Sequence, residues 1–600
     1  MTSRTFAVLA CALAACAPAH RGSQAGDAGS GGILVVEPTT VTVTVVNGQT
    51  QTQPYIATRV FDDGARVDVT AQATFTLANP ALGAIVDATF APSGMPGMTS
   101  VAASLPDGTN GSAQLTVMVQ ASRIEGTAPA TAASLFAAAS EDPTLAPAIA
   151  YPADGILVPP NLGAFDVHWT SASDDLFAVE LSNAFCSYTI YTTGQPGPQW
   201  WTVVTPDEWA ALASVQQELT LTVAGLSTAA PTQKGTSAPQ HVDVTNESML
   251  GGVYFWTTTS PQGVFRHDMS QPNTPAGPFF MPSQDPGGAN NCMGCHALSH
   301  DGTKLALTID QAGGPGTVID VADGSVLVPY ATNPQYWDFA TFNADGSKLV
   351  TAQTTGNGGM GAMVLRATAG GAVLASIPSS PNMYATQPEL SPDGTMLADV
   401  EESVLDNDIQ PTTGAIVTRS FDDATNTFGP ITTVLADGVD GLSSYYPSWS
   451  PDGKWLLVTR AAGDAYANPE STVWVLKADG SVPPIELARA DLTGSLENSW
   501  ARWAPFAQTT GDGEQVFFFT FSSQRAFGVR IPAPGTPQIW MAPFYPTLAV
   551  QGMDPSGPAF RLPFQPVDTH NHIAQWTQQV IVIEARHRGA VATTSASSAE

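Results

Sequence analysis

The sequence predicts an all-β protein, and three observations carry this prediction. The chain has 600 residues, of which 43% are hydrophobic, and it is rich in turn formers, with 54 Gly and 48 Pro. Residues 40–45 alternate Thr and Val, which is the period of a half-buried strand. Asp-Gly pairs, which favour tight hairpins, recur along the chain. Short strands joined by turns, spread over three or four domains, follow from these features.

An export signal is predicted at the N-terminus. Residues 1–16 contain an apolar run that ends in Leu-Ala-Ala-Cys, and this ending resembles the lipobox of bacterial lipoproteins. The resemblance implies a lipid on Cys16 and an outer-membrane lipoprotein, on its periplasmic or surface face. An ordinary secretory signal, cut near Ala17 or Ala19, is the alternative. Residues 17–32 read as a flexible tether of small and polar residues.

Residues 33–120 are predicted to form a small β-sandwich. Strands of period two are separated there by turn signals at Asn47-Gly48, Asp63-Gly64 and Asp107-Gly108. The line YIATRVFDDGARVDVTAQATFTLANPALGAIV resembles the bacterial Ig-like group 2 module. This resemblance implies a spacer rather than a catalytic domain.

A second β domain is predicted after an Ala/Pro/Ser-rich linker at residues 121–147. Residues 148–248 are loosely similar to a fibronectin type III domain, with Trp169 as the expected core tryptophan. His168, next to it on an alternating strand, is expected to be a packing residue rather than a ligand.

The rest of the chain, residues 249–585, repeats itself. Five Asp-Gly turns, each between two short strands, recur at intervals of 44 to 60 residues and begin at Asp301, Asp345, Asp393, Asp452 and Asp512. Such units cannot bury both faces alone, but several packed around an axis can. Segments such as WSPDGKWLLVT resemble the six-bladed β-propellers of TolB-like proteins.

The sixth blade is expected to combine the two ends of this region. Residues 252–256 and 263–266 look like an outer hairpin, and residues 559–563 and 572–576 are expected to complete the same blade. Residues 586–600 are predicted to be a disordered tail. The Trp-rich positions, which are Trp449, Trp455, Trp474, Trp500 and Trp503, are expected in the propeller core rather than in a sugar site.

The stretch Cys292-Met293-Gly294-Cys295-His296 is the pattern that carries covalent c-type haem. Cys292 and Cys295 would form thioethers to one haem, and His296 would be the proximal iron ligand. Three other interpretations stay open: a disulfide, a zinc site, and a degenerate motif without a cofactor. The chain has only five cysteines, which argues against a disulfide framework and leaves Cys186 without an assigned role.

The sixth iron ligand is less defined. His572, with His570 behind it, is the leading candidate, because ring closure should bring residues 568–576 beside the first blade. His300, and His267 with Met269, are further candidates, and an open five-coordinate iron is the remaining alternative.

Composition and motifs limit the function. The formal net charge is −31 and only 21 residues are Lys or Arg, so no basic face for nucleic acid is expected. We find no nucleophile elbow, phosphate loop or H-E-x-x-H motif. The sequence favours an envelope cytochrome that exchanges electrons with a redox partner protein. A TolB-like scaffold, in which the haem is structural or sensory, is the alternative, and a peroxidase-type enzyme is a third class.

Overall fold

The computed structural model describes residues 32–193, 199–282, 292–310, 313–330, 335–354, 360–404 and 410–581. The protein is all-β, which confirms the predicted class. The predictions for Cys16 and for the C-terminal tail lie outside the described residues. None of the helices in the described ranges is long and apolar enough to cross a membrane.

The chain divides into two compact units. The first holds Thr52–Ala91 and Met98–Leu115 together with the chain up to Thr42, and the second holds the intervening pieces and everything from Thr116 onward. Strands β2 (Thr40–Val46) and β10 (Asn110–Glu125) have residues in both units.

The first unit is built from small sheets, in which β1 pairs with β4, β4 with β5, β3 with β8, and β6 with β9. Burial alternates along β9, as period two predicts. The strands are β1 (Gly32–Glu37), β3 (Gln53–Pro54), β4 (Ile56–Phe61), β5 (Arg66–Asp68), β6 (Thr74–Leu77), β7 (Gly83–Val86), β8 (Thr89–Pro92) and β9 (Gly97–Ser104).

The second unit begins with a β domain of two sheets, ordered β12-β14-β17 and β11-β19-β18-β15-β16-β10. Trp169 on β14 is fully buried, as predicted. The elements are α1 (Ala132–Ala138), β11 (Ser140–Glu141), β12 (Ala148–Tyr151), β13 (Ile156–Val158), β14 (Phe165–Thr170), β15 (Leu176–Ser182), β16 (Cys186–Thr192), β17 (Gln199–Val204), α2 (Pro206–Ala213), β18 (Leu219–Leu226), β19 (Gln233–Thr236) and β20 (Gln240–Val244).

The segment predicted as a linker, residues 121–147, is structured. Strand β10 continues to Glu125, and residues 119–125 pair with β16. Helix α1 buries Phe136 in a cluster with Leu176 and Leu226. The Ala-rich composition looked like a linker, but Ala is also the best helix former, and one buried aromatic side chain fixes the helix in place.

The remaining residues form antiparallel sheets, ordered β23-β22-β21-β46, β24-β25-β26-β27, β28-β29-β30-β31, β32-β33-β34-β36, β37-β38-β39-β40 and β41-β43-β44-β45. The second and third are parts of one eight-stranded sheet, because β26 also pairs with β28. Their bounds are β21 (Gly252–Thr257), β22 (Gly263–Asp268), β23 (Gly277–Phe280), β24 (Cys292–Leu298), β25 (Lys304–Asp310), β26 (Pro315–Asp320), β27 (Val326–Val328), β28 (Gln335–Phe342), β29 (Lys348–Thr354), β30 (Met360–Ala367), β31 (Val373–Ile377), β32 (Tyr384–Leu390), β33 (Met396–Glu402), β34 (Ala415–Asp422), β35 (Thr427–Phe428), β36 (Thr432–Leu435), β37 (Ser443–Trp449), β38 (Trp455–Ala461), β39 (Thr472–Lys477), β40 (Ile485–Glu486), α3 (Ala488–Asp491), β41 (Ser499–Trp503), β42 (Gln508–Thr509), β43 (Gln515–Ser523), β44 (Gln538–Phe544), α4 (Pro546–Ala549), β45 (Phe560–Arg561) and β46 (Asn571–Thr577).

The five predicted Asp-Gly turns all lie in hairpins: the first four join the first two strands of a sheet, and the turn at Asp512 joins β42 to β43. Each glycine adopts a positive φ, from 67° at Gly453 to 87° at Gly513. Glycine reaches this region without the steric cost that a Cβ imposes. The repeat found in the sequence is therefore the repeat of the structure.

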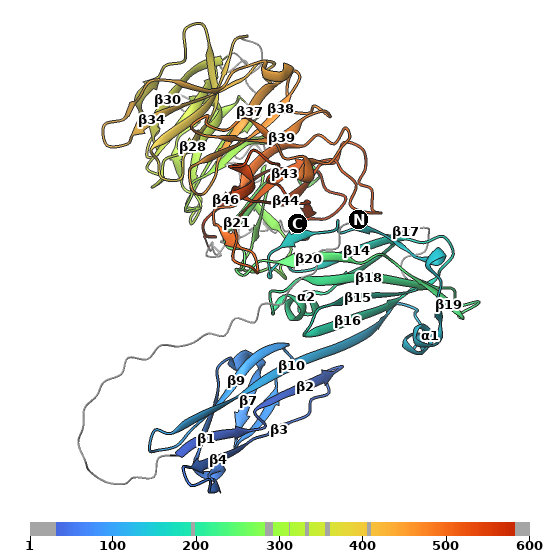
Figure 1. Ribbon diagram of the computed structural model, residues 1–600. Coiled ribbons are helices and arrows are strands. Elements are labelled where there is room, and N and C mark those ends of the chain that lie inside the picture. Colours follow the sequence, from blue (N-terminus) through green and yellow to red (C-terminus); the bar gives the residue numbers. More distant parts are fainter. Residues whose placement is uncertain are drawn as a thin grey trace, which may run out of the picture. The chain divides into compact units, whose positions relative to one another are not determined.

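The first strands of successive sheets contact one another in the circuit β24, β28, β32, β37, β41, β46 and back to β24. Strand β46, near the end of the described chain, pairs with β21 (Figure 1). This confirms that residues 572–576 return to the start of the region. The prediction for residues 559–563 is wrong, because β45 pairs instead with β44, its close neighbour in the sequence.

The second β domain packs against the sheet that contains β44. The ring of His168 lies 4.5 Å from that of Phe527, and the ring of Tyr151 lies 4.8 Å from it, between centroids. One continuous apolar cluster includes residues of both parts. This contact is called the domain contact below.

Candidate cofactor-binding cavity

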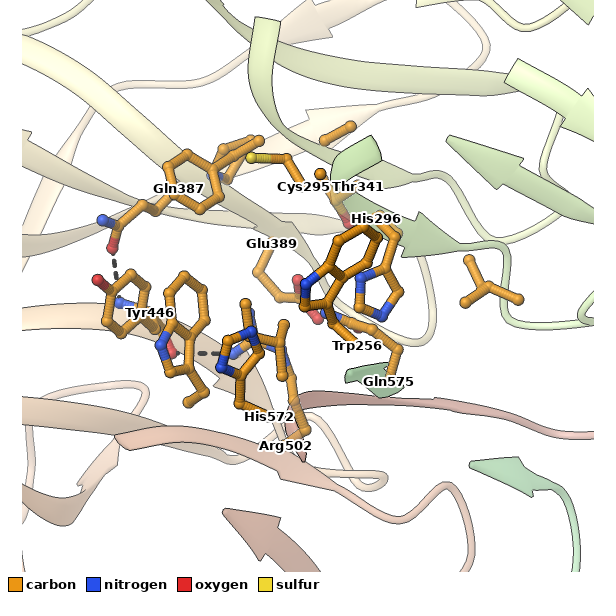
Figure 2. A pocket seen from close by; sticks show the side chains of 18 of the residues that line it. Trp256, Cys295, His296, Thr341, Gln387, Glu389, Tyr446, Arg502, His572 and Gln575 are labelled. Carbon is orange, nitrogen blue, oxygen red and sulfur yellow. Dashed lines mark hydrogen bonds between the residues drawn. The ribbon is translucent and has the colours of Figure 1, made fainter. Parts of the chain in front are cut away.

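A cavity of about 350 Å³ lies among the first strands of these sheets. Side chains from β24, β28, β32, β37, β41 and β46 all line it (Figure 2). Much of the wall is aromatic and is formed by Trp256, Phe339, Tyr446, Trp500 and Trp576. A concave, largely apolar site with a few polar groups is the usual form of a cofactor or ligand site.

A repeated β-bulge shapes the cavity wall. The pairing register shifts within the first strand of each sheet. At this shift Cys295, Gln387, Tyr446, Trp500 and Ile573 have left-handed backbones, with φ between 46° and 58°. Such backbones cost roughly 1–3 kcal/mol each and cluster at functional sites. A bulge also re-aims the side chains of its strand, here onto the cavity wall.

Cys295 and His296 lie on this wall, on β24 (Figure 2). The Sγ atom of Cys295 is 3.9 Å from Oδ1 of Asp338. His296 is only 4% exposed, and its Nε2 has no hydrogen-bond partner among the described residues. Burial lowers the pKa of His296 to about 4, so the imidazole is neutral near pH 7, the form that binds metals. The side chain of Cys292 lies outside the described residues, although its backbone begins β24.

The structure brings His572 to the same cavity. Burial, together with repulsion from His570 and His296, lowers the pKa of His572 to about 3. The rings of His570 and His572 are 5.0 Å apart. His570 lines a smaller adjoining pocket of about 250 Å³, which shares His572 with the cavity. His300 also lines the cavity, and burial lowers its pKa.

Other residues singled out in the sequence lie elsewhere. His267 stacks on Phe564, with ring centroids 4.1 Å apart, and Met269 belongs to the apolar core. Neither lines the cavity, so both act as packing residues. Cys186 is buried on β16, where burial raises the pKa of its thiol to about 11.

The tryptophans divide between core and cavity. Trp449, Trp455 and Trp503 are buried in apolar clusters, as predicted, and Trp474 packs against one of them. Trp500 is also buried, but it lines the cavity and stacks on Tyr446, with ring centroids 3.7 Å apart.

Two charged cavity residues were missed in the sequence, Glu389 and Arg502 (Figure 2). Burial raises the pKa of Glu389 to about 7, against the opposing effect of Arg502. The sequence did contain a signal for this cavity wall, in the spacing of its residues from the Asp-Gly turns. Gln387 and Tyr446 each lie six residues before the aspartate of an Asp-Gly turn, which is also the position of Cys295. Glu389 follows two residues after Gln387.

The described residues fit a haem better than a bare metal ion. No three His, Cys, Asp or Glu side chains in the described ranges gather closely enough to hold a metal. A haem iron needs only one or two protein ligands, since the porphyrin supplies the others. The unpartnered Nε2 of His296, the adjacent thiol of Cys295 and the aromatic walls agree with that need.

No protein-family model and no curated protein matches the chain. Among solved structures, hydrazine synthase from Kuenenia stuttgartiensis is 14% identical, over 43% of this chain and 70% of that one, with a TM-score of 0.29. The nidogen/laminin complex is 10% identical, over 55% and 99%, with a TM-score of 0.34. The β-propeller domain of Cps50 (Swd1) from Myceliophteria thermophila is 13% identical, over 46% and 97%, with a TM-score of 0.26. At these values the likenesses carry no argument about function.

Proposed function

We propose that the cavity holds one covalently attached c-type haem and that the protein passes single electrons in the cell envelope. Cys292 and Cys295 form the thioethers, and His296 is the proximal ligand. One observation carries the proposal: the buried Nε2 of His296 lacks a partner in the described part of the chain and lies beside Cys295 on a cavity wall. Haem, when bound, supplies reversible one-electron exchange.

The chain's own residues perform three tasks in this proposal. His296 stays neutral near pH 7 because burial lowers its pKa, so its ring nitrogen is available as a ligand. The stacked rings of Tyr446 and Trp500 form a flat apolar wall. This wall excludes water, and low solvent exposure is one of the factors that set a haem potential.

His572 is our candidate for the distal ligand, since it lines the same cavity from β46. His300 lines the cavity too and is the second candidate. His570 is the third, because it touches the adjoining pocket and not the cavity itself.

The proposed architecture follows from the same residues. The six sheets are the blades of one propeller of the TolB-like type, and β46 joins its last and first blades. The N-terminal Ig-like module and the fibronectin-III-like domain are spacers. A lipid on Cys16 anchors the protein to the outer membrane, where it meets a redox partner protein or another envelope component.

Absorption spectra of the exported full-length chain, made in a host that attaches c-type haem, test the proposal. We expect a Soret band, a shift of the visible bands on reduction, and haem that stays with the polypeptide after denaturation. The double variant Cys292→Ala/Cys295→Ala should lose the covalent haem.

Cys186→Ala is the matched control, because its thiol is buried in the other β domain. It should keep the wild-type spectrum. A wild-type chain that carries no covalent haem under these conditions would overturn the proposal.

A further inference from the structure

Arg502, on β41, presents a charge that the protein leaves largely unpaired. Its Nη1 donates to the backbone oxygens of Tyr446 and Ala501, each at 3.1 Å. Its Nε is buried and has no partner among the described residues. A guanidinium has five N–H donors in a fixed fork, so two backbone acceptors satisfy only part of it.

Two buried arginines in the described ranges differ from Arg502 because side-chain oxygens accept from their guanidinium groups, although Nε of Arg419 also lacks a partner there. Nη2 of Arg419 lies 2.8 and 2.9 Å from the two carboxylate oxygens of Asp399. Arg561 donates from Nε and Nη2 to the side-chain oxygen of Gln538, at 2.9 and 2.7 Å. Glu389 also lines the cavity and interacts with Arg502 electrostatically, but no ion pair in the described part of the chain joins the two side chains. Because a shielded charge is costly unless it is also hydrogen-bonded, the open donors of Arg502 favour a further anion from outside the chain.

The surroundings of Arg502 define that anion. Tyr446 and Trp500 stack nearly parallel, at 20°, and the ring of Phe339 lies 6.2 Å from that of Trp500. Flat aromatic walls beside a guanidinium fork suit a planar molecule that carries a carboxylate, which arginine binds in a bidentate manner.

We propose that Arg502 is the carboxylate-binding residue of the cavity and anchors the planar molecule held there. Two sources share this chemistry. In the first, which rests on the proposed function, the carboxylate is a haem propionate. In the second it belongs to a free aromatic carboxylate that enters the cavity. Arg502 is a positioning residue in the first case and a ligand-recognition residue in the second.

The first arm of the test uses the haem-loaded full-length protein. Replacing the charge in Arg502→Met should lower the reduction potential, because a nearby positive charge favours the reduced haem. Arg502→Lys keeps the positive charge, so its reduction potential should lie between those of Arg502→Met and wild type. It also serves as the second variant if Arg502→Met folds poorly. Arg366→Met is the matched control: Arg366 is buried on β30, its Nη2 also lacks a partner among the described residues, and it does not line the cavity.

The second arm uses the full-length chain made without haem attachment and titrated with benzoate by calorimetry. If the carboxylate is a free ligand, benzoate binds and Arg502→Met weakens the binding at least about tenfold. An unchanged potential in Arg502→Met, together with benzoate binding that is absent or unaffected by the substitution, would overturn the inference and leave the haem proposal standing. Protein that takes up neither haem nor benzoate would overturn both.

Discussion

Two buried histidines, His296 at the cavity and His168 at the domain contact, are alike in their burial and in their lowered pKa but differ in their surroundings. Each has an Nε2 without a partner among the described residues. Burial lowers the pKa of His296 to about 4 and that of His168 to about 3. Around His168 there is no room, since a Cβ on Gly528 would lie 2.3 Å from its Nδ1. His296 faces a cavity and follows a cysteine. Burial and a lowered pKa therefore do not distinguish the two histidines, whereas the adjoining space and the neighbouring thiol of His296 do.

The charged side chains of the domain contact and of the cavity also differ in their surroundings. At the domain contact, burial raises the pKa of Asp166, and Arg561 beside it donates to the side chain of Gln538. In the cavity, Glu389 and Arg502 face open space. The side chains of the domain contact are closely packed, whereas those of the cavity wall border open space.

The largest expected effect is a loss of stability at the domain contact. Phe527→Ala removes a ring that packs on Tyr151 and His168 and should cost about 3–5 kcal/mol of unfolding free energy. Phe339→Ala, at the half-buried cavity wall, should cost only about 1–2 kcal/mol, because that ring already borders space. Denaturant unfolding measures both, and equal losses would contradict the contrast.

Acid should destabilise the domain contact next. The unfolded chain protonates His168 below its ordinary pKa of 6.5, but the folded chain does so only near pH 3. Between these values the unfolded state binds more protons, so the free energy of unfolding falls as pH falls, by about 2 kcal/mol at pH 5. His168→Gln should flatten this part of the pH profile. A variant profile parallel to that of wild type would contradict the assignment.

At His296 we expect a smaller change in the free energy of unfolding but a larger change in the absorption spectrum. His296→Gln removes the proposed proximal ligand and leaves the thioethers, so covalent haem should remain with an altered spectrum. His168→Gln should leave the spectrum unchanged. Identical absorption bands in His296→Gln and His168→Gln would contradict the proposed difference between the two histidines.

The smallest expected effect is at the distal side. His572→Ala should change the low-spin bands, whereas His570→Ala should leave them unchanged because His570 lines only the adjoining pocket. Low-temperature electron paramagnetic resonance distinguishes the two. Unchanged signals in both variants would assign the sixth position to His300 or leave it open.

Sequence alone predicted the parts of the fold that local chemistry determines. The Asp-Gly turns gave the hairpins, since glycine is the residue that tolerates their positive φ, and period two gave the strands. The return of residues 572–576 was also predicted, because a ring without closure leaves open sheet edges. The placement of residues 559–563 was wrong because β45, Phe560–Arg561, is a strand of only two residues and carries no pattern that selects one sheet edge over another.

The cavity was predicted only in part. Cys295 and His296 were identified by spacing, but Glu389 and Arg502 belong to no known motif, and the fixed distance of several β-bulges from the Asp-Gly turns was not used to find them. His168 and His296 are alike in burial, so burial alone does not separate them, whereas the cysteine spacing before His296 already did so in the sequence.

The pairing of β46 with β21 has a consequence for the order of events during synthesis. His572 and Trp576 close the cavity from a strand that is made long after β24. Until that strand arrives, the wall around Cys295 and His296 is incomplete, and an enzyme that joins haem to the two thiols has access to them. In the proposed cytochrome, haem attachment would therefore precede the pairing of β46 with β21, which completes the cavity wall.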